Sequence, residues 1–207
     1  MRRLFISFEG GEGAGKSTQM QMLYSFLAAR GFDVVSVRDP GTTNVSEKIR
    51  NILKDKATGD ISARVEALLY FAARAQMVDE IVRPALDEGK VVITDRFAHS
   101  TYVYQGYAGG MDVGNLAQIN DFATKGFLPN LTFYLQISPE NGLKRKAAQQ
   151  DLDRIEAKGL EYHKQISAGY DKIAADDESG RIITIDATLP AEEIHNKIVS
   201  HIEKILI

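Results

Sequence analysis

The sequence predicts an α/β fold in which helices cover both faces of a central parallel sheet. Short apolar runs that suit buried strands alternate with segments of helical periodicity along all 207 residues. Because continuously apolar strands are buried on both faces, we expect a five-stranded parallel sheet with helical crossovers. The chain is 44% hydrophobic and 26% charged, which is typical of a globular protein, and its length favours a single domain over residues 1–207.

Three of the five expected strands lie in the first half of the chain. Residues 4–8 form the first strand, and apolar residues then recur at helical spacing until Gly31 ends the helix. Residues 34–37 form the second strand. A longer helical pattern over residues 63–86 leads to the third strand at residues 91–94.

The second half of the chain supplies the remaining two strands, at residues 131–135 and 182–185. Pro139 suits the first turn of the helix after the fourth strand. One apolar face of a closing helix follows the fifth strand, at Ile194, Ile198, Ile202 and Leu206. Residues 144–158 are charged and contain glutamines, so we expect this stretch to form a short mobile lid.

Charge and composition exclude several classes of protein. The formal net charge is −3, so no global basic field would draw the chain to nucleic acid, and we expect no such partner. There is no cysteine, which excludes a disulfide scaffold and fits a reducing cytoplasm. No apolar run approaches the roughly 18 residues that a membrane helix needs, and no signal peptide is evident. We expect a cytoplasmic protein without a membrane partner.

A phosphate-binding loop is predicted between the first strand and the first helix. Residues 10–17 read GGEGAGKS and fit the pattern G-x-x-x-x-G-K-[ST]. Glycines let backbone N–H groups converge on phosphate oxygens, the Lys16 ammonium can reach the outer phosphates, and the Ser17 hydroxyl can ligate Mg²⁺. The motif predicts a P-loop NTPase fold with an ATP site made by Gly10, Gly11, Glu12, Gly13, Ala14, Gly15, Lys16, Ser17 and Thr18.

A second acidic group is expected at the end of the third strand, where Asp95 follows four apolar or β-branched residues. In P-loop proteins a carboxylate at this place can join the magnesium shell. A carboxylate that caps the following loop is the alternative interpretation. The neighbouring Arg96 carries a planar guanidinium, which suits bidentate binding of a phosphate.

Other P-loop classes fit less well. A GTPase should carry an Asn-Lys-x-Asp signature, but the one Asn-Lys pair, at Asn196 and Lys197, lies in the closing helix. A regulatory or partition ATPase remains an alternative from a different class, and it should hydrolyse ATP without an acceptor.

Further sequence blocks narrow the class. They read FEG at 8–10, RDPG at 38–41, YFAAR at 70–74, DRF at 95–97, STYVYQG at 100–106 and DR at 153–154. In this order, the set resembles the bacterial thymidylate kinase (dTMP kinase) family over essentially the whole chain. A kinase acting on another pyrimidine monophosphate is the nearest alternative.

The resemblance implies an enzyme of dTTP biosynthesis that transfers the γ-phosphoryl group of MgATP to dTMP, giving dTDP and ADP. Catalysis would fall to Lys16, Asp95, Arg96 and Glu9, with Mg²⁺ held by Ser17 and Asp95. For Glu9, the alternative is a strand-end carboxylate held by loop amides. The acceptor dTMP would be bound by Glu9, Arg38, Pro40, Arg50, Tyr70, Arg74, Arg96, Ser100, Thr101, Tyr104 and Gln105.

Within that set, the resemblance implies that Arg96 and Arg50 grip the acceptor phosphate and that Arg74 hydrogen-bonds thymine. It implies that Tyr104 disfavours a ribose 2′-hydroxyl. The adenine of ATP is expected near residues 186–189. The family is typically homodimeric, and the packed helices could use the apolar positions around Leu68, Leu69 and Ala72.

The chain also departs from the family pattern. Tyr70 replaces the usual stacking phenylalanine, and Asp39 and Thr42 differ from the commoner loop sequence. The P-loop carries no arginine, yet Ala147 and Gln149 stand where related lids often have arginines. Among the lid residues Lys144, Arg145, Lys146 and Arg154, the sequence leaves open whether Arg145, Lys146 or Arg154 supplies the positive charge at the transferring group.

Overall fold

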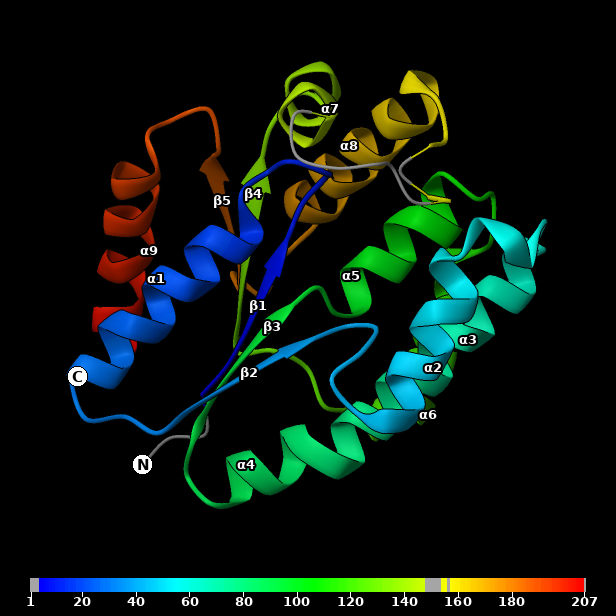
Figure 1. Ribbon diagram of the computed structural model, residues 1–207. Helices are drawn as coiled ribbons and strands as arrows, with labels where there is room; N and C mark the ends of the chain where they lie inside the picture. Colours follow the sequence, from blue (N-terminus) through cyan, green and yellow to red (C-terminus); the bar gives the residue numbers. More distant parts are fainter. Residues whose placement is uncertain (1–3, 148–153, 156, 207) are drawn as a thin grey trace.

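A five-stranded parallel sheet forms the centre of the protein in the computed structural model, which describes residues 4–147, 154, 155 and 157–206 (Figure 1). The strand order is β2-β3-β1-β4-β5. All neighbouring pairs are parallel, as the sequence predicts. The bounds are β1 Leu4–Glu9, β2 Val34–Arg38, β3 Val91–Asp95, β4 Leu131–Gln136 and β5 Ile182–Asp186, each of which contains one predicted strand.

Helices α1 (Lys16–Ala29) and α9 (Ala191–Leu206) lie together on one side of the sheet (Figure 1). Their buried side chains, including Leu23 and Ile198, pack with those of β1, β3, β4 and β5 in one apolar cluster. This packing explains the helical periodicity at both ends of the sequence, because each helix buries one apolar stripe against the sheet.

The opposite side of the sheet carries the long helical run predicted over residues 63–86. It consists of α3 (Ala63–Met77), the π-helical turn η2 (Val78–Val82) and α4 (Arg83–Asp87). Met77, Val82 and Leu86 from this run pack against Phe5 of β1 and Val92 of β3 in a second apolar cluster. Beyond β3, the chain continues as the short helix α5 (Ala98–Thr101) and the π-helical run η3 (Tyr102–Tyr107).

Besides the short α5, three helices were not predicted: α2 (Asn44–Lys54), α6 (Val113–Thr124) and α8 (Leu160–Ala175). In α2 only Ser46 and Leu53 are buried, although Val45, Ile49, Ile52 and Leu53 recur at helical spacing, a signal that the sequence analysis did not use. Side-chain caps define the starts of α2 and α6, because Thr43 and Asp112 accept hydrogen bonds from backbone N–H groups of the first turns. Helices α2 and α6 both pack on α3.

The expected lid falls partly on helix α7 (Pro139–Ala147), which begins at the predicted proline. Residues 148–153 and 156 of the expected lid, Gln149 among them, lie outside the described residues. A short 3₁₀ turn, η1 (Lys56–Thr58), follows α2. Within the described part of the chain, none of the helices combines the length and the apolar character that crossing a membrane would require.

The register of the sheet places the sequence motifs at one edge. Asp95, at the end of β3, is paired with Phe8 of β1 and with Arg38 of β2. Since all strands are parallel, the residues that follow each strand converge at this carboxyl edge, where ligands bind in open α/β sheets. The P-loop, Arg96 and the loop after β2 are therefore brought together.

Candidate active site

A cavity of about 850 Å³ lies at the carboxyl edge of the sheet. It joins most of the predicted site residues, which come from segments far apart in the sequence. Those that line it are Glu12, Gly13, Ala14, Gly15, Lys16, Ser17, Thr18, Arg38, Pro40, Arg50, Tyr70, Arg74, Asp95, Arg96, Ser100, Thr101, Tyr104, Gln105, Arg145 and Lys146. The predicted residues Glu9, Gly10, Gly11, Lys144 and Arg154 are not among its lining residues.

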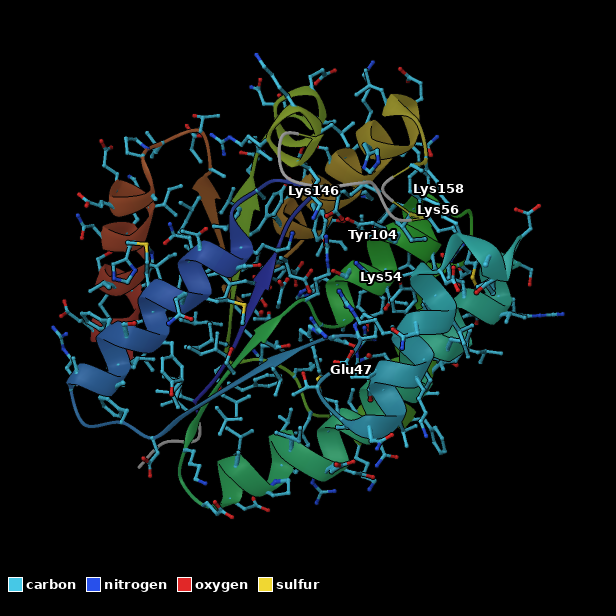
Figure 2. All side chains as sticks on the ribbon, in the orientation of Figure 1. Glu47, Lys54, Lys56, Tyr104, Lys146 and Lys158 are labelled. Atoms are coloured by element: carbon cyan, nitrogen blue, oxygen red, sulfur yellow. The ribbon has the colours of Figure 1, made fainter. Side chains whose placement is uncertain are left out.

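The cavity is strongly cationic although the whole chain is negative. Among the described residues that line it, eight side chains are lysine or arginine and three are aspartate or glutamate. The formal net charge of the chain is −3. Such a local excess of positive charge in a cleft attracts and binds polyanionic ligands. Figure 2 shows three labelled side chains that line it, Lys146 of α7, Tyr104 of η3 and Lys54 of α2, on the side of the molecule between α7 and α2.

The P-loop connects β1 to α1 and leads into that helix through Gly15, whose backbone is left-handed (φ +89°). The Lys16 ammonium donates to the carbonyl oxygens of Gly10 and Gly11, at 3.1 and 2.9 Å. Burial and the nearby Arg96 guanidinium lower the pKa of Lys16. A buried ammonium close to a second cation is a strong attractor for phosphate oxygens.

Backbone atoms of the P-loop and of α7 touch at two glycines. A β-carbon built on Gly13 would collide with the carbonyl oxygen of Gly142, and one built on Gly142 would collide with that of Glu12. Gly13 also has a left-handed backbone (φ +69°). This close approach requires glycine on both sides, and it brings the start of the expected lid to the P-loop.

The carboxylate of Glu12 reaches across the cavity to residues that were predicted to bind the acceptor. Its Oε1 accepts from Nη2 of Arg96 at 2.7 Å and from the hydroxyl of Tyr104 at 2.9 Å. Burial would raise the pKa of Glu12, but Arg96, Lys16 and the Tyr104 hydroxyl lower it to about 2. Glu12 is thus a fixed negative charge on the guanidinium of Arg96.

Arg96 is placed by an unusual backbone conformation (φ +70°), which non-glycine residues rarely adopt. Its Nη1 donates to the Gly10 carbonyl oxygen, the Ser100 hydroxyl and the Tyr170 hydroxyl, at 3.0 to 3.2 Å. The guanidinium also lies 5.0 Å from the ring centroid of Tyr104. Strained backbone that is held by so many contacts is typical of functional sites.

Glu9, the last residue of β1, holds the loop after β3 that carries Arg96. It is fully buried and accepts from the backbone N–H of Phe97 (2.8 Å), the Ser100 hydroxyl (2.6 Å) and the Tyr170 hydroxyl (2.9 Å). Since it does not line the cavity, this placement favours the interpretation of Glu9 as a strand-end carboxylate that fixes the loop after β3.

Ser17 and Asp95 meet beside the P-loop. The Ser17 hydroxyl donates to Oδ2 of Asp95 at 3.3 Å, and Oδ1 of Asp95 is buried without a hydrogen-bond partner in the described structure. A buried carboxylate oxygen without a partner is costly and calls for a ligand. Hard oxygen donors of this kind fit Mg²⁺, which typically takes few protein ligands and keeps its bonds to water and phosphate.

At the far end of the cavity, the guanidinium of Arg74 is surrounded by polar partners. Its Nε donates to Oδ2 of Asp39 at 2.5 Å, Nη1 to Asn120 at 3.0 Å, and Nη2 to Thr101 (2.8 Å) and the Phe97 carbonyl oxygen (3.1 Å). Arg74 and Asp39 are almost completely buried. Burial raises the pKa of Asp39, although the Arg74 charge opposes that rise. Arginine has five N–H groups, so one on Nη1 is left for a ligand.

The two remaining predicted arginines of the acceptor site lie near the opening. Arg38 is exposed and pairs with Glu47 of α2 at 2.9 Å. Arg50 donates to the Pro40 carbonyl oxygen at 2.8 Å, and burial together with the charge of Arg38 lowers its pKa. Both guanidinium groups line the cavity.

The basic residues of the expected lid occupy different places. Arg145 and Lys146 line the cavity, and Arg145 donates to the Ala187 carbonyl oxygen at 2.9 Å. Ala187 and Leu189, from the segment expected near adenine, line the cavity too. Arg154 instead donates to the Glu66 carboxylate and to the Leu53 carbonyl oxygen, whereas Lys144 is exposed on α7.

Several residues of the site were missed by the sequence analysis. Tyr170 of α8 contacts Glu9 and Arg96, Asn120 of α6 contacts Arg74, and Glu66 of α3 contacts Gln105. Each lies on a helix whose local sequence pattern indicates a buried face but gives no sign of a contact with the site. One signal was available: a buried arginine needs buried acceptors, which an acid or amide elsewhere in the chain had to supply.

The parallel sheet, the glycine-rich loop after β1 and the cationic cavity above the sheet edge are the architecture of a P-loop nucleotide-binding protein. Comparison with known proteins gives the family. A sequence profile described as Thymidylate kinase matches residues 8–198, which is most of the chain. The protein therefore belongs to the thymidylate kinase family.

Individual relatives match this chain over all or nearly all of their length. The chain is 41% identical to a thymidylate kinase of Thermoanaerobacter sp. (strain X514) over 206 residues, covering 100% of both chains. It is 44% identical over 196 residues to one from Geobacillus sp. (strain WCH70), covering 94% of this chain and 93% of that protein. The crystal structure of thymidylate kinase from Ehrlichia chaffeensis superimposes with a TM-score of 0.80 at 26% identity, covering 98% of this chain and 100% of that one.

Proposed function

We propose that the protein transfers the γ-phosphoryl group of ATP to dTMP, giving dTDP and ADP. The observation that carries this proposal is the single cationic cavity, which runs from the P-loop to the buried Arg74–Thr101 group. One end offers a triphosphate site and the other offers directed hydrogen bonds, so a donor and an acceptor nucleotide can share one cleft. Direct in-line transfer needs positioning and charge stabilisation rather than a covalent intermediate.

On the donor side, the P-loop amides and the Lys16 ammonium would bind the phosphates of ATP. Ser17 and Asp95 would hold Mg²⁺, which neutralises charge on the phosphate oxygens. The buried, unpartnered Oδ1 of Asp95 and its neighbour Ser17 support this assignment. Ala187 and Leu189, beside Arg145, offer an apolar site for the adenine.

On the acceptor side, Arg96 would bind the phosphate of dTMP, with Arg50 and Arg38 nearer the opening. The guanidinium of Arg96 pairs with the Glu12 carboxylate, which supports its assignment as an anion-binding group. The remaining N–H of Arg74 can donate to a carbonyl oxygen of thymine, and Tyr70, half-buried in the cavity wall, can stack on the ring.

The positive charge of the lid is best assigned to Lys146. It lines the cavity in the last turn of α7, which the contact between Gly13 and Gly142 brings next to the P-loop. Arg154, by contrast, is not among the residues that line the cavity.

We also infer a homodimer that is formed through α3. Val65, Leu68 and Ala72 repeat at helical spacing and are all exposed, Leu68 at 51%. The neighbouring α6 exposes Phe122 at 88%. Apolar patches of this kind mark protein–protein contacts. Light scattering should give the mass of a dimer for the wild type and of a monomer for Leu68→Glu, and a monomeric wild type would contradict the inference.

The reaction is tested by measuring ADP production from MgATP with dTMP, dUMP, dCMP or thymidine as the acceptor. We expect a strong preference for dTMP, and loss of that activity in Lys16→Met. The control Lys125→Met removes a lysine whose exposed ammonium pairs with Asp79, and it should behave like the wild type. Equal ADP release with and without an acceptor would instead indicate an ATPase.

A further inference from the structure

A buried carboxylate, that of Glu66, connects two parts of the acceptor end of the cavity. Glu66 lies on α3 and is 4% exposed. Its Oε1 accepts from Nε2 of Gln105 at 2.8 Å, and its Oε2 accepts from Nη2 of Arg154. Arg154 also donates from Nε to the Leu53 carbonyl oxygen at 2.9 Å. Glu66 on α3 thus joins η3 to the segment at residue 154, and Arg154 in turn joins that segment to the end of α2.

The chemistry of Glu66 decides how the amide of Gln105 is turned. A carboxylate only accepts hydrogen bonds, so the NH₂ group of Gln105 must face it and the amide oxygen must face away. That oxygen, Oε1, is buried and has no hydrogen-bond partner in the described part of the chain. An unpaired buried oxygen is costly. Without Glu66, the amide of Gln105 would therefore be free to turn until its oxygen found a hydrogen-bond donor. Gln105 is 1% exposed and lines the cavity.

The direction of this amide matters for a pyrimidine. Thymine and uracil carry a hydrogen on N3, which needs a hydrogen-bond acceptor. N3 of cytosine carries no hydrogen and is itself an acceptor. If the amide oxygen of Gln105 points away from Glu66, it can accept a hydrogen bond from N3–H of thymine or uracil. If the amide is turned the other way, its NH₂ group can donate to N3 of cytosine instead.

Arg154 acts on the same end of the cavity through its neighbour in the chain. Ile155 is 6% exposed, lines the cavity and packs in one apolar cluster with Tyr104 and Tyr170. The bonds from Arg154 to Glu66 and Leu53 fix the backbone from which Ile155 projects. Loss of either bond would loosen this wall of the acceptor pocket.

We propose that Glu66 and Arg154 are positioning residues for the acceptor nucleotide: Glu66 fixes the hydrogen-bonding direction of Gln105, and Arg154 seats Ile155 in the pocket wall. The inference rests on the proposed function. It assigns Arg154 to acceptor binding and not to charge stabilisation at the transferring phosphoryl group.

The test measures the kinetics of Glu66→Gln, Arg154→Met and Arg154→Lys with dTMP and with dCMP. We expect the KM for dTMP to rise about tenfold in Glu66→Gln and Arg154→Met, while kcat and the KM for ATP stay within about twofold. Glu66→Gln should also lower the preference for dTMP over dCMP, because a glutamine can both donate to and accept from Gln105. Arg154→Lys keeps the charge and should recover part of the dTMP affinity.

Two further variants separate positioning from stability. Breaking a buried ion pair leaves a charge unpaired, so the double variant Glu66→Gln/Arg154→Met removes both charges and should fold where a single variant does not. Thermal unfolding is recorded for each protein. Arg30→Met, which breaks the exposed pair with Glu203 outside the cavity, is the control and should leave the kinetics unchanged.

The outcomes are distinct. A fall of kcat by a hundredfold or more in Arg154→Met at unchanged KM for dTMP would place Arg154 at the transferring group and overturn the inference. Unchanged KM and unchanged base preference in the double variant would overturn it as well. A wild type that makes no ADP in response to dTMP would instead refute the proposed function itself.

Discussion

Glu12 of the P-loop and Arg96 after β3 form an ion pair of 2.7 Å across the cavity. The pair thereby joins the P-loop to the loop that follows β3. Because both side chains are largely buried, solvent screens the pair weakly, and the lowered pKa of Glu12 indicates that the ionised carboxylate stabilises the fold.

Acid should weaken the protein through Glu12. The pKa of this carboxyl falls from 4.5 to about 2 on folding, so its contribution is complete above pH 4.5 and is lost as the pH falls toward 2. A shift of this size corresponds to about 3 kcal/mol of unfolding free energy. Urea unfolding should show that Glu12→Gln is less stable than the wild type at pH 6, and that the difference shrinks as the pH is lowered to 3. Parallel losses in the two proteins would contradict the prediction.

Replacing Asp95 by asparagine should raise the Mg²⁺ concentration needed for half-maximal activity at least tenfold. The substitution keeps the shape of the side chain but removes the charge that a hard divalent cation prefers. A magnesium titration of dTMP-dependent ADP production measures the effect. Asp79→Asn, an exposed aspartate that pairs with Lys125, is the matched control, and an equal shift in both variants would argue against a metal ligand at Asp95.

The buried pair of Arg74 and Asp39 should be important for stability. Arg74→Met leaves the Asp39 carboxylate buried without its counter-charge, which costs about 3–5 kcal/mol of unfolding free energy. Denaturant unfolding near neutral pH measures this loss. An exposed pair contributes at most about 1 kcal/mol, so Asp79→Asn should be nearly neutral in the same assay. Similar losses in both variants would refute the special role of the buried pair.

Lys146→Met should lower kcat about a hundredfold with little change in either KM, because one positive charge at the transferring group is lost while the substrates still bind. Steady-state kinetics with saturating ATP and dTMP give the answer. Lys164→Met, which removes an exposed lysine of α8 paired with Glu161, should have wild-type kinetics. A normal kcat for Lys146→Met would move the assignment to Arg145.

The three central strands β1, β3 and β4 could be predicted from sequence because they are mostly apolar and almost completely buried. The edge strands β2 and β5 are only partly buried, and their β-branched residues indicated them instead. Helix α2 was missed although its sequence carries two signals, the cap at Thr43 and the apolar residues Val45, Ile49, Ile52 and Leu53 at helical spacing. The P-loop was recognisable because the backbone geometry requires its glycines at fixed spacing.

The supporting residues of the site were beyond sequence reasoning for a related reason. Tyr170 and Glu66 act through hydrogen bonds to residues distant in the chain, and no local pattern records such a contact. Arg154 is a similar case. The sequence shows its positive charge, but it does not show that the partner of this charge is Glu66 on α3.

The contact between Gly13 and Gly142 also restricts how such an enzyme can evolve. With no space for a side chain at position 13, an arginine cannot be introduced there while α7 stays where it is. A chain that gains a side chain at this position must therefore displace or reshape α7 as well.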